Sequence, residues 1–494
     1  MSASSGNRST ATALLVAAAI CAGCASPAGS PEPKAAGTLS EWGPCAPTEP
    51  AGVECSTLTV PFDYARPDER TFTIPLVRIA ARGEKPRLLL TNPGGPGISG
   101  VGDLRSNREY FAGFTDTHTV VSFDPRGVGG SEPALSCLDD QQRQAIFNQP
   151  SVPTTEPQMT RAAELAAGIG DACERRFADA LAHVGTADVA RDMDEIRKAL
   201  GFERIDYLGY SYGTFLGAVY ADTFPGHFDR VVLDSVMDPK LDYAGVRHGQ
   251  ARGMQHSVTA FAEDCLRQPQ CALTGNPDQA VRQISAIIAD LDREPYVGSD
   301  GRALSGARML ALVESSQYFP TSGWPSLRDT LDHAVSGDWP AVLEAAHSPD
   351  LMVNPADSQY LSVVCIDFQD DRDPQSPRTF APVWAAESPV SGGNRAWSLQ
   401  PCETWPAGPV REPGPVQVDG AGQVLILSTT GDPATLLSWA QSLHDQIEGS
   451  TLVVVPAEGH IASAQSGCAE DALTAFLRRG ELPPGPVYTC PANS

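Results

Sequence analysis

The chain has few basic residues. Lysine and arginine number 35 against 60 aspartates and glutamates in 494 residues, which gives a formal net charge of −25. A surface of this sign repels a phosphate backbone and an anionic membrane, so we expect no nucleic-acid partner. The sequence also shows no internal repeat and none of the paired Cys-x-x-Cys motifs of structural zinc sites. We therefore expect neither a bound metal nor a cofactor.

The sequence also lacks an apolar run long enough to span a bilayer, which takes about 20 residues. Its apolar N-terminal run, residues 11–20, follows Arg8 and precedes a stretch of small residues at 21–24. This order is typical of a signal peptide. We predict that residues 1–23 are a signal peptide and that the protein is exported.

The end of this segment resembles the lipobox of bacterial lipoproteins. Residues 22–24 (AGC) fit that motif, although Cys21 stands where leucine is usual. In such lipoproteins the cysteine carries a diacylglycerol, so Cys24 is the predicted lipidation site of a cell-membrane lipoprotein. The alternative is cleavage after Ala25 or Ala28, which leaves a secreted protein without an anchor. We expect contact with the membrane only through this anchor.

Ten cysteines remain when Cys21 and Cys24 are set aside from the 12 in the chain. An even number in an oxidising compartment indicates disulfides. The ten fall along the chain as five neighbouring pairs. We predict a disulfide within each pair: Cys45 with Cys55, Cys137 with Cys173, Cys265 with Cys271, Cys365 with Cys402, and Cys468 with Cys490.

The order of apolar runs predicts an α/β protein. Residues 24–40 are small or polar, and we expect them to form a tether. Beyond them, strand patterns alternate with helical patterns such as residues 187–200, which favours a mostly parallel sheet flanked by helices. The predicted strands are residues 58–62, 71–79, 87–91, 119–123, 205–208, 230–233, 423–427 and 451–455.

Between the sixth and seventh of these strands the pattern becomes helical and rich in loops. We expect an inserted, mainly helical cap at residues 241–415. The α/β core would then consist of residues 41–240 and 416–494, a combined length near the upper end for a single domain. In such sheets ligands bind beyond the carboxyl ends of the strands.

A serine lies between two glycines at the end of one predicted strand. The pattern Gly209-x-Ser211-x-Gly213 is followed by a helical pattern at residues 215–220. It matches a nucleophile elbow, in which the glycines permit a tight turn that lifts the serine hydroxyl above the sheet. An ordinary Gly/Ser turn is the alternative, and the position directly after a strand favours catalysis. Ser211 is the predicted nucleophile.

A serine hydroxyl needs a base, and the base needs an acid that fixes its tautomer. In folds with this elbow the chain order is serine, acid, histidine. The strand at 423–427 leads into Asp432, and the next strand, 451–455, leads into His460. We predict that His460 is the general base and that Asp432 is its acid. Asp234 also ends a core strand and is the alternative acid.

Attack on a carbonyl creates an oxyanion that needs preorganised N–H donors. The glycine-rich stretch at 94–97 follows a strand and lets the backbone approach a substrate. We predict that Gly95 supplies one donor and that Tyr212, the residue after the nucleophile, supplies the other. The sequence alone does not separate Gly95 from Gly94.

A second motif overlaps the glycine-rich stretch. Residues 95–100 fit Gly-x-Gly-x-x-Gly after a strand, and Asp124 ends the next strand as a ribose-binding acid would. A dinucleotide-binding oxidoreductase is therefore an alternative, although Pro96 offers no N–H to a phosphate and the order of serine, acid and histidine stays unexplained. We expect instead that Asp124 and Arg126 brace a turn beneath the site.

Several segments of the chain recur together in one known family. They are residues 92–97 (NPGGPG) with 99–100 (SG), 123–127 (FDPRG), 209–214 (GYSYGT), 233–239 (LDSVMDP), 401–402 (PC) with 405–406 (WP), 431–435 (GDPAT) and 459–460 (GH). In this combination the chain resembles the secreted tripeptidyl-aminopeptidase-like serine peptidases of actinomycetes, relatives of prolyl iminopeptidases. The resemblance departs at Ser235 and Ile461, where glycine is expected.

The resemblance implies an α/β-hydrolase fold whose cap limits access to the site. It also implies hydrolysis of short peptides, or removal of di- or tripeptides from a free N-terminus. Some members of the group are described as carboxylesterases, so a small ester is the alternative substrate. A binding lipoprotein on an inactive hydrolase fold is a third class, and it would show no turnover that depends on Ser211.

An aminopeptidase must also bind a free α-amino group, which is cationic below a pKa of about 8. Burying that charge requires a carboxylate, and the resemblance suggests that this partner lies in the cap. Glu314, in the helical stretch at 309–317, and Asp367, just after Cys365, are the predicted candidates because both lie near apolar residues.

Overall fold

The computed structural model of the chain describes residues 37–46, 52–348, 351, 357–368, 372–418 and 423–492. The predicted signal peptide, the lipidation site at Cys24 and the tether up to residue 36 lie outside the described residues. Among the helices of the described residues, none combines the length and the hydropathy needed to cross a membrane.

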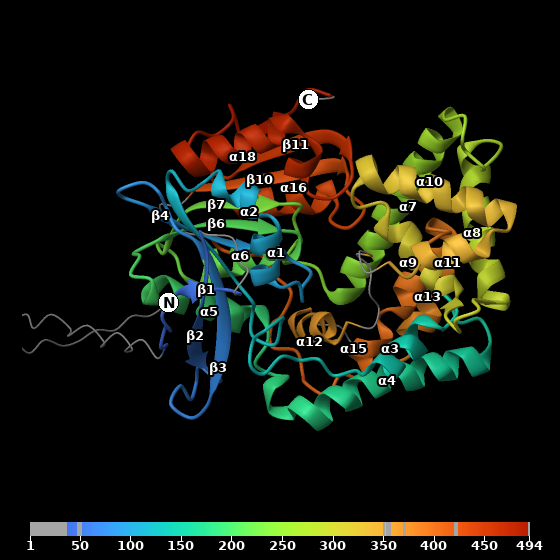
Figure 1. Cartoon of the computed structure of the whole chain (residues 1–494), viewed down its shortest axis with the longest axis horizontal. Helices are drawn as coiled ribbons and strands as arrows, with labels where there is room; N and C mark the ends of the chain where they lie inside the picture. Colours follow the sequence, from blue (N-terminus) through green and yellow to red (C-terminus); the bar gives the residue numbers. More distant parts are fainter. Residues whose placement is uncertain are drawn as a thin grey trace, which may run out of the picture. The chain divides into compact units, whose positions relative to one another are not determined.

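One sheet holds most of the strands. They are β1 (Gly43–Pro44), β2 (Val53–Pro61), β3 (Thr71–Ile79), β4 (Arg87–Asn92), β5 (His118–Phe123), β6 (Ile205–Tyr210), β7 (Phe228–Asp234), β10 (Gln423–Gly431), β11 (Thr451–Glu458) and β12 (Val487–Thr489). Their order is β1-β2-β3-β5-β4-β6-β7-β10-β11-β12 (Figure 1). The pairs up to β3-β5 are antiparallel. All later pairs are parallel, which confirms the predicted sheet.

Helices cover both faces of this sheet. Side chains alternate between the faces of a strand, and in β4 Leu88 and Leu90 pack into one apolar cluster whereas Leu89 packs into another. The first cluster also contains residues of α5 (Thr186–Ala199), α6 (Tyr212–Thr223) and α16 (Leu437–Gln446), and the second contains residues of α1 (Gly100–Ser106), α2 (Arg108–Ala112) and α18 (Gly467–Arg479). Burial on both faces explains the continuous apolar sequence of β4.

The segment between β7 and β10 is mainly helical, as expected. Its helices are α7 (Tyr243–Arg267), α8 (Pro277–Arg293), α9 (Gly306–Ser315), α10 (Pro320–Ser336), α11 (Trp339–Ala345), α12 (Ser358–Asp367), α13 (Ser376–Glu387), α14 (Gly392–Trp397) and α15 (Gln400–Glu403). An unexpected hairpin joins β8 (Tyr296–Val297) to β9 (Ala303–Leu304). Helices α7 to α11 share an apolar cluster of their own, whereas α12 to α15 pack into the first cluster of the sheet.

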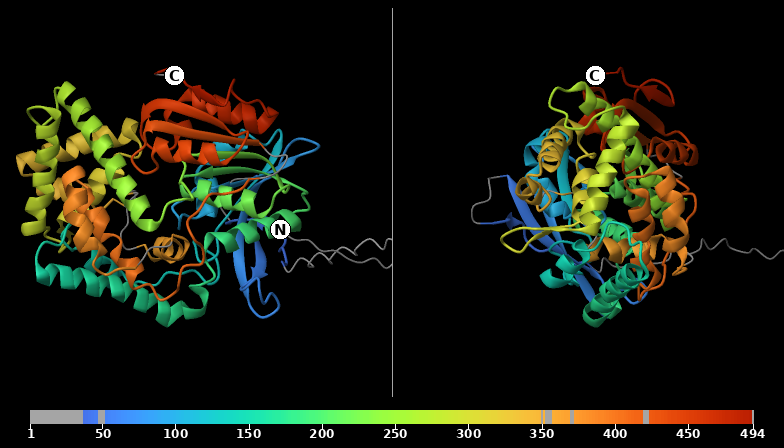
Figure 2. Two further views of the ribbon diagram at one scale, coloured as in Figure 1. Left: turned by 180° about the vertical axis from the view of Figure 1, so that it is seen from behind. Right: turned by 90° about the vertical axis from the view of Figure 1, so that its right-hand side faces the viewer.

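Two helices from the first core segment also contact the inserted helices. Helix α3 (Asp140–Phe147) accepts a hydrogen bond from Ser305 Oγ to its last carbonyl oxygen, at 2.6 Å. Helix α4 (Glu156–Phe177) packs against α15, and Figures 1 and 2 show it running along the inserted helices. Chain from before β7 therefore helps to build the region of the inserted helices.

The structure contains the five disulfides that the cysteine spacing predicts. They join Cys45 to Cys55, Cys137 to Cys173, Cys265 to Cys271, Cys365 to Cys402, and Cys468 to Cys490. The fourth ties α12 to α15, so it crosslinks two of the helices that pack against the sheet cluster.

Candidate active site

Ser211 occupies the turn between β6 and α6. Its backbone has φ 54° and ψ −123°, a conformation that non-glycine residues rarely adopt and that concentrates at functional sites. The flanking glycines are required by close contacts: a Cβ on Gly213 would lie 2.6 Å from the Asn92 carbonyl oxygen, and one on Gly209 would collide with the Gly213 carbonyl. The turn therefore holds the serine at the carboxyl end of its strand, as an elbow does.

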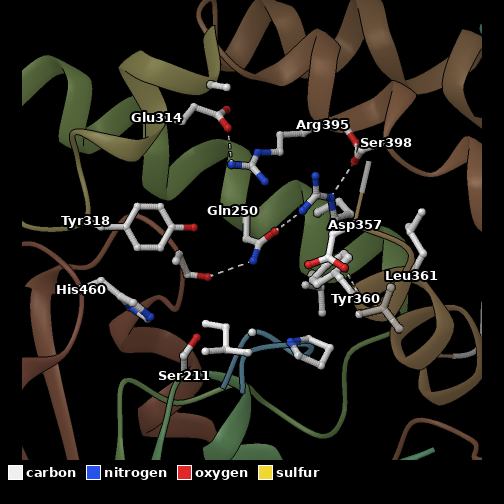
Figure 3. Close-up of a pocket in the computed structure, with 18 of the residues that line it drawn as sticks. Ser211, Gln250, Glu314, Tyr318, Asp357, Tyr360, Leu361, Arg395, Ser398 and His460 are labelled. Atoms are coloured by element: carbon white, nitrogen blue, oxygen red, sulfur yellow. Dashed lines mark hydrogen bonds and ion pairs between the residues drawn. The ribbon is translucent and has the colours of Figure 1, made fainter. Parts of the chain in front are cut away.

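His460 and Asp432 meet at the ends of β11 and β10. The imidazole Nδ1 lies 2.9 Å from each carboxylate oxygen of Asp432, and both side chains are buried. Asp432 Oδ1 also accepts N–H bonds from Ala434 and Thr435, and its Oδ2 accepts the Thr435 hydroxyl at 2.9 Å. These donors fix the carboxylate. Because Nδ1 faces Asp432, the opposite side of the imidazole, with Nε2, is turned toward Ser211 (Figure 3).

The inserted segment also contacts the histidine. The main-chain N–H of His460 donates to the Tyr318 carbonyl oxygen at 2.8 Å. The Tyr318 ring stands edge-on to the imidazole, with 5.3 Å between the ring centres. Gln465 Nε2 donates to the His460 carbonyl oxygen at 2.9 Å. The orientation of the imidazole thus depends on the insertion as well as on the core.

The alternative acid, Asp234, has different partners. Its carboxylate accepts the Ala462 N–H at 2.7 Å, the Ser463 N–H at 3.1 Å and the Ser463 hydroxyl at 2.5 Å. Burial raises the pKa of this carboxyl group, and these hydrogen bonds oppose the rise. Asp234 therefore caps the short helix α17 (Ala462–Gln465), which follows the histidine, and it is Asp432 that is hydrogen-bonded to the imidazole.

Ser235 and Ile461, which stand where the family resemblance predicts glycine, contact each other. Ser235 and Ile461 have φ values of 63° and 65°, in the region that favours glycine. The Ile461 N–H donates to Ser235 Oγ at 2.9 Å. The serine thus contributes a hydrogen bond that glycine could not make, whereas a β-branched isoleucine at such a φ is strained.

The glycine-rich loop lies against the nucleophile turn. A Cβ on Gly94 would come within 3.0 Å of the Tyr212 nitrogen. The Gly94 N–H donates to Asn92 Oδ1 at 2.9 Å, so it is already used, which favours Gly95 as the donor toward a substrate. Tyr212 is the first residue of α6, and N–H groups in a first helical turn have no acceptor within the helix. Gly95 lines the pocket that contains Ser211, and Tyr212 directly follows Ser211 in the chain.

A pocket of about 950 Å³ opens above Ser211. Figure 3 shows Ser211 and His460 at one side of it, with Glu314 and Arg395 from the inserted helices at the opposite side. Glu314 is buried and accepts a hydrogen bond from Arg395 Nη2 at 2.6 Å through Oε2. Its Oε1 is buried without a hydrogen-bond partner among the described residues. One of the two carboxylates predicted to bind an amine therefore lines the pocket.

The other, Asp367, has a structural role. Its carboxylate accepts the Thr186 N–H at 3.0 Å and the Thr186 hydroxyl at 2.5 Å, which caps α5. Its side chain is buried outside the wall of the pocket, and burial raises its pKa to about 7. The expectation that Asp367 binds a substrate amine is therefore wrong, because its oxygens are already used by α5.

Asp124, the acid that a dinucleotide site would use to bind the ribose, also has a structural role. Asp124 accepts the Ser99 hydroxyl at 2.5 Å and the N–H groups of Val101 and Gly130 at 3.0 and 2.8 Å. Its carboxylate therefore occupies the N-terminus of α1, where a pyrophosphate would bind. Arg126 does brace the structure as expected, but through Asp192, 2.5 Å away, and not through Asp124.

The structure adds pocket residues that the sequence did not reveal. Arg247 and Gln250 on α7, Arg395 on α14 and Tyr318 after α9 all line the cavity. No motif surrounds them, so nothing in the sequence separates them from other polar residues of the insertion. Thr435 is different, since it lies in the matched segment 431–435, yet its contact with Asp432 needs the fold to be seen.

Comparison with known proteins assigns the family. The sequence profile of the alpha/beta hydrolase fold matches residues 87–466. Over 480 residues the chain is 31% identical to the serine protease Hip1 of Mycobacterium tuberculosis, covering 92% of this chain and 91% of that protein. It is 30% identical to the tripeptidyl aminopeptidase of Streptomyces coelicolor (89% and 84% covered) and 31% identical to carboxylesterase B of Mycobacterium tuberculosis (88% and 86%). The chain therefore belongs to the α/β-hydrolase family, and it is a serine hydrolase similar to the tripeptidyl aminopeptidases.

Proposed function

We propose that the protein is an exported peptidase that cleaves short peptides near a free N-terminus through an acyl-enzyme on Ser211. The observation that carries this proposal is the hydrogen-bonded pair of His460 and Asp432 beside that serine, at one side of the pocket. The relatives named serine protease and tripeptidyl aminopeptidase support the choice of a peptide bond as the target.

The reaction follows the chemistry of a serine triad. His460 Nε2 takes the hydroxyl proton as Ser211 Oγ attacks the peptide carbonyl, while Asp432 stabilises the imidazolium that forms. The N–H groups of Gly95 and Tyr212 hold the oxyanion. The intermediate collapses, the amine leaves with the proton from His460, and an acyl-serine remains. Water then attacks the ester and gives its proton to the imidazole. When this second intermediate collapses, the bond to Ser211 Oγ breaks, His460 returns the proton to that oxygen, and the acid is released.

The size of the pocket supports short substrates. Ligand pockets span roughly 300–1,000 Å³, and this one measures about 950 Å³ beneath the inserted helices. A peptide of a few residues fits such a space, whereas a folded protein does not. The free acceptor at Glu314 Oε1 supports binding of the N-terminal ammonium there.

A carboxylesterase is the second candidate, since one relative of similar identity is named carboxylesterase B. Esters have no α-ammonium group, so they do not need Glu314. Free-amine tripeptide coumarin amides, their N-acetyl forms and short 4-nitrophenyl esters separate the two functions when wild type is compared with Ser211→Ala. Peptide turnover that vanishes in this variant supports the peptidase; ester turnover alone supports the esterase. No turnover of any of these substrates would refute both and leave a binding protein.

The proposed binding of the substrate ammonium at Glu314, which we call the amine site, has its own test. Glu314→Gln should raise KM for free-amine peptides at least about tenfold more than KM for N-acetyl peptides, because a charge-assisted hydrogen bond is lost. Glu344→Gln, an exposed carboxylate of the same insertion, is the matched control. Because both substrates are measured on one preparation, partial unfolding cancels from the ratio. Equal KM changes for the two substrates would remove the amine site.

Export is supported by the five disulfides, which form in oxidising compartments. Lipidation rests on the sequence motif at residues 22–24. Cys24 is the proposed lipidated residue. Metabolic labelling with an alkynyl fatty acid should mark wild type and Cys21→Ala but not Cys24→Ala. Labelling that survives Cys24→Ala would contradict this site.

A further inference from the structure

Arg247 on α7 is a buried cation that lines the pocket and forms no ion pair among the described residues. Only 9% of the residue is exposed. Its Nε donates to Ser398 Oγ at 2.6 Å, and its Nη1 donates to Gln250 Oε1 at 2.7 Å. Both acceptors are neutral. No carboxylate oxygen of the described residues lies within 4.0 Å of the guanidinium nitrogens.

Two other buried arginines, Arg126 and Arg395, are paired with carboxylates. Arg126 binds the Asp192 carboxylate at 2.5 Å, and Arg395 binds the Glu314 carboxylate at 2.6 Å. Burying a charge is costly unless a partner of opposite sign compensates it. The position of Arg247 on the pocket wall means that such a partner can come from a bound molecule.

The nearby carboxylates of the pocket wall are held by groups other than Arg247. On the side of the pocket opposite the nucleophile, the Glu314 carboxylate is paired with Arg395. Asp357 also lines the pocket, but its Oδ1 accepts the N–H groups at the start of α12, and burial raises its pKa. Neither carboxylate forms an ion pair with Arg247, which leaves its guanidinium available to an anion bound in the pocket.

We propose that Arg247 binds a carboxylate of the substrate. A guanidinium presents two parallel N–H groups to a carboxylate, which gives strength and a defined geometry. The carboxylate can belong to an acidic side chain or to the C-terminus of a short peptide. This rests on the proposed function only in placing a peptide in the Ser211 pocket.

The proposal also bears on the amine site at Glu314. An N-terminal ammonium bound there alone would add a third positive group beside two guanidiniums. A substrate carboxylate on Arg247 offsets that repulsion. Peptides that carry a carboxylate close to the bound end should therefore be better substrates than their neutral counterparts.

The test compares isosteric substrates on the same enzyme preparation. Free-amine tripeptide coumarin amides carry Glu or Gln at each position in turn, and a tetrapeptide free acid is compared with its C-terminal amide. Wild type should prefer the charged member of one pair by about tenfold in kcat/KM, the loss expected for one charge-assisted hydrogen-bonded contact. The pair that shows the preference identifies which carboxylate is bound.

The variants locate the preference. Arg247→Gln should reduce the ratio of kcat/KM between the charged and the neutral substrate to near one. Arg247→Lys should retain part of the preference because the positive charge remains. Arg308→Gln is the matched control: Arg308 is also a buried arginine of the insertion with a neutral partner, Gln144 at 2.6 Å, but it lies outside the pocket wall. Its ratio should equal that of wild type. Because each ratio compares two substrates, a partly unfolded variant still gives a valid result.

Two outcomes overturn the proposal: no charge preference in wild type, or a preference that survives Arg247→Gln. If peptides are not cleaved at all and only esters are, the peptidase function fails independently. The carboxylate site is then tested on 4-nitrophenyl hemiglutarate against 4-nitrophenyl butyrate. The same preference for the charged ester, lost in Arg247→Gln, supports it, and equal turnover refutes it.

Discussion

Replacing Asp432 by asparagine should trap His460 in the wrong tautomer. Asp432 Oδ1 accepts N–H groups from Ala434 and Thr435 at 2.9 and 2.8 Å, so the asparagine carbonyl oxygen is expected to keep that position. The NH2 group then replaces Oδ2 and donates to His460 Nδ1. The ring proton must move to Nε2, and a ring protonated there cannot accept the proton of Ser211.

The expected loss of kcat is large because every turnover requires His460 Nε2 to accept the proton of Ser211. A wrong tautomer in a serine triad lowers kcat by about 10⁴-fold, equivalent to about 5 kcal/mol of transition-state stabilisation. KM should change little, since the pocket wall is untouched. Initial rates on a fluorogenic peptide or ester, normalised to the folded fraction by circular dichroism, measure the effect. Labelling by a fluorophosphonate should slow in proportion.

Asp234→Asn is the matched control, since Asp234 is also a buried aspartate at a strand end. Asparagine can keep only part of its bonds to Ala462 and Ser463, so we expect a lower melting temperature and a kcat within about tenfold of wild type, as loss of one hydrogen bond to a charged group implies. Near-normal activity of Asp432→Asn together with an inactive, folded Asp234→Asn would refute the assignment.

Three further predictions concern single residues. Ser211→Ala should abolish fluorophosphonate labelling while the melting temperature is unchanged; label found on another serine would reject the nucleophile. Ile461→Gly should change the free energy of unfolding by less than about 1 kcal/mol, because relief of the strain at a φ of 65° offsets the entropy of glycine; a loss above about 2 kcal/mol in urea would contradict this. Burial raises the pKa of Asp367 to about 7, so the folded chain keeps a proton that the unfolded chain, with a pKa of about 4, has lost. The free energy of unfolding should therefore fall as pH rises from about 4 to about 7, and Asp367→Asn should reduce that slope, whereas equal slopes would mean that this carboxyl ionises normally.

The core could be predicted because its signals are local in sequence. Strands β10 and β11 contain the apolar runs 424–427 (VLIL) and 452–455 (LVVV), and each group of the triad follows its strand within a few residues. Parallel strands bring their carboxyl ends to one edge, so Ser211, Asp432 and His460 are expected to meet without knowledge of any long-range contact. The choice between Asp432 and Asp234 followed from chain order, and the hydrogen bonds to His460 agree with it.

Backbone strain could be predicted only in part. The resemblance to known peptidases marked Ser235 and Ile461 as positions where glycine is expected, and both have positive φ. That the Ser235 hydroxyl would accept the Ile461 N–H was not predictable, because it depends on two loops that are 226 residues apart in the chain.

The two carboxylates proposed for the amine show why the pocket could not be derived in the same way. Glu314 and Asp367 have similar local sequences, since each lies near the end of a short apolar helix. Their roles are set by partners far along the chain: Arg395, 81 residues away, pairs with Glu314 in the pocket, and Thr186, 181 residues away, holds Asp367 against α5. A helical pattern tells which side of a helix is buried but not which other helix covers it. The substrate contacts proposed for Glu314 and Arg247 depend on such helix-to-helix contacts. The test of Arg247 therefore bears on specificity, the test of Asp432 bears on the chemistry, and either can fail alone.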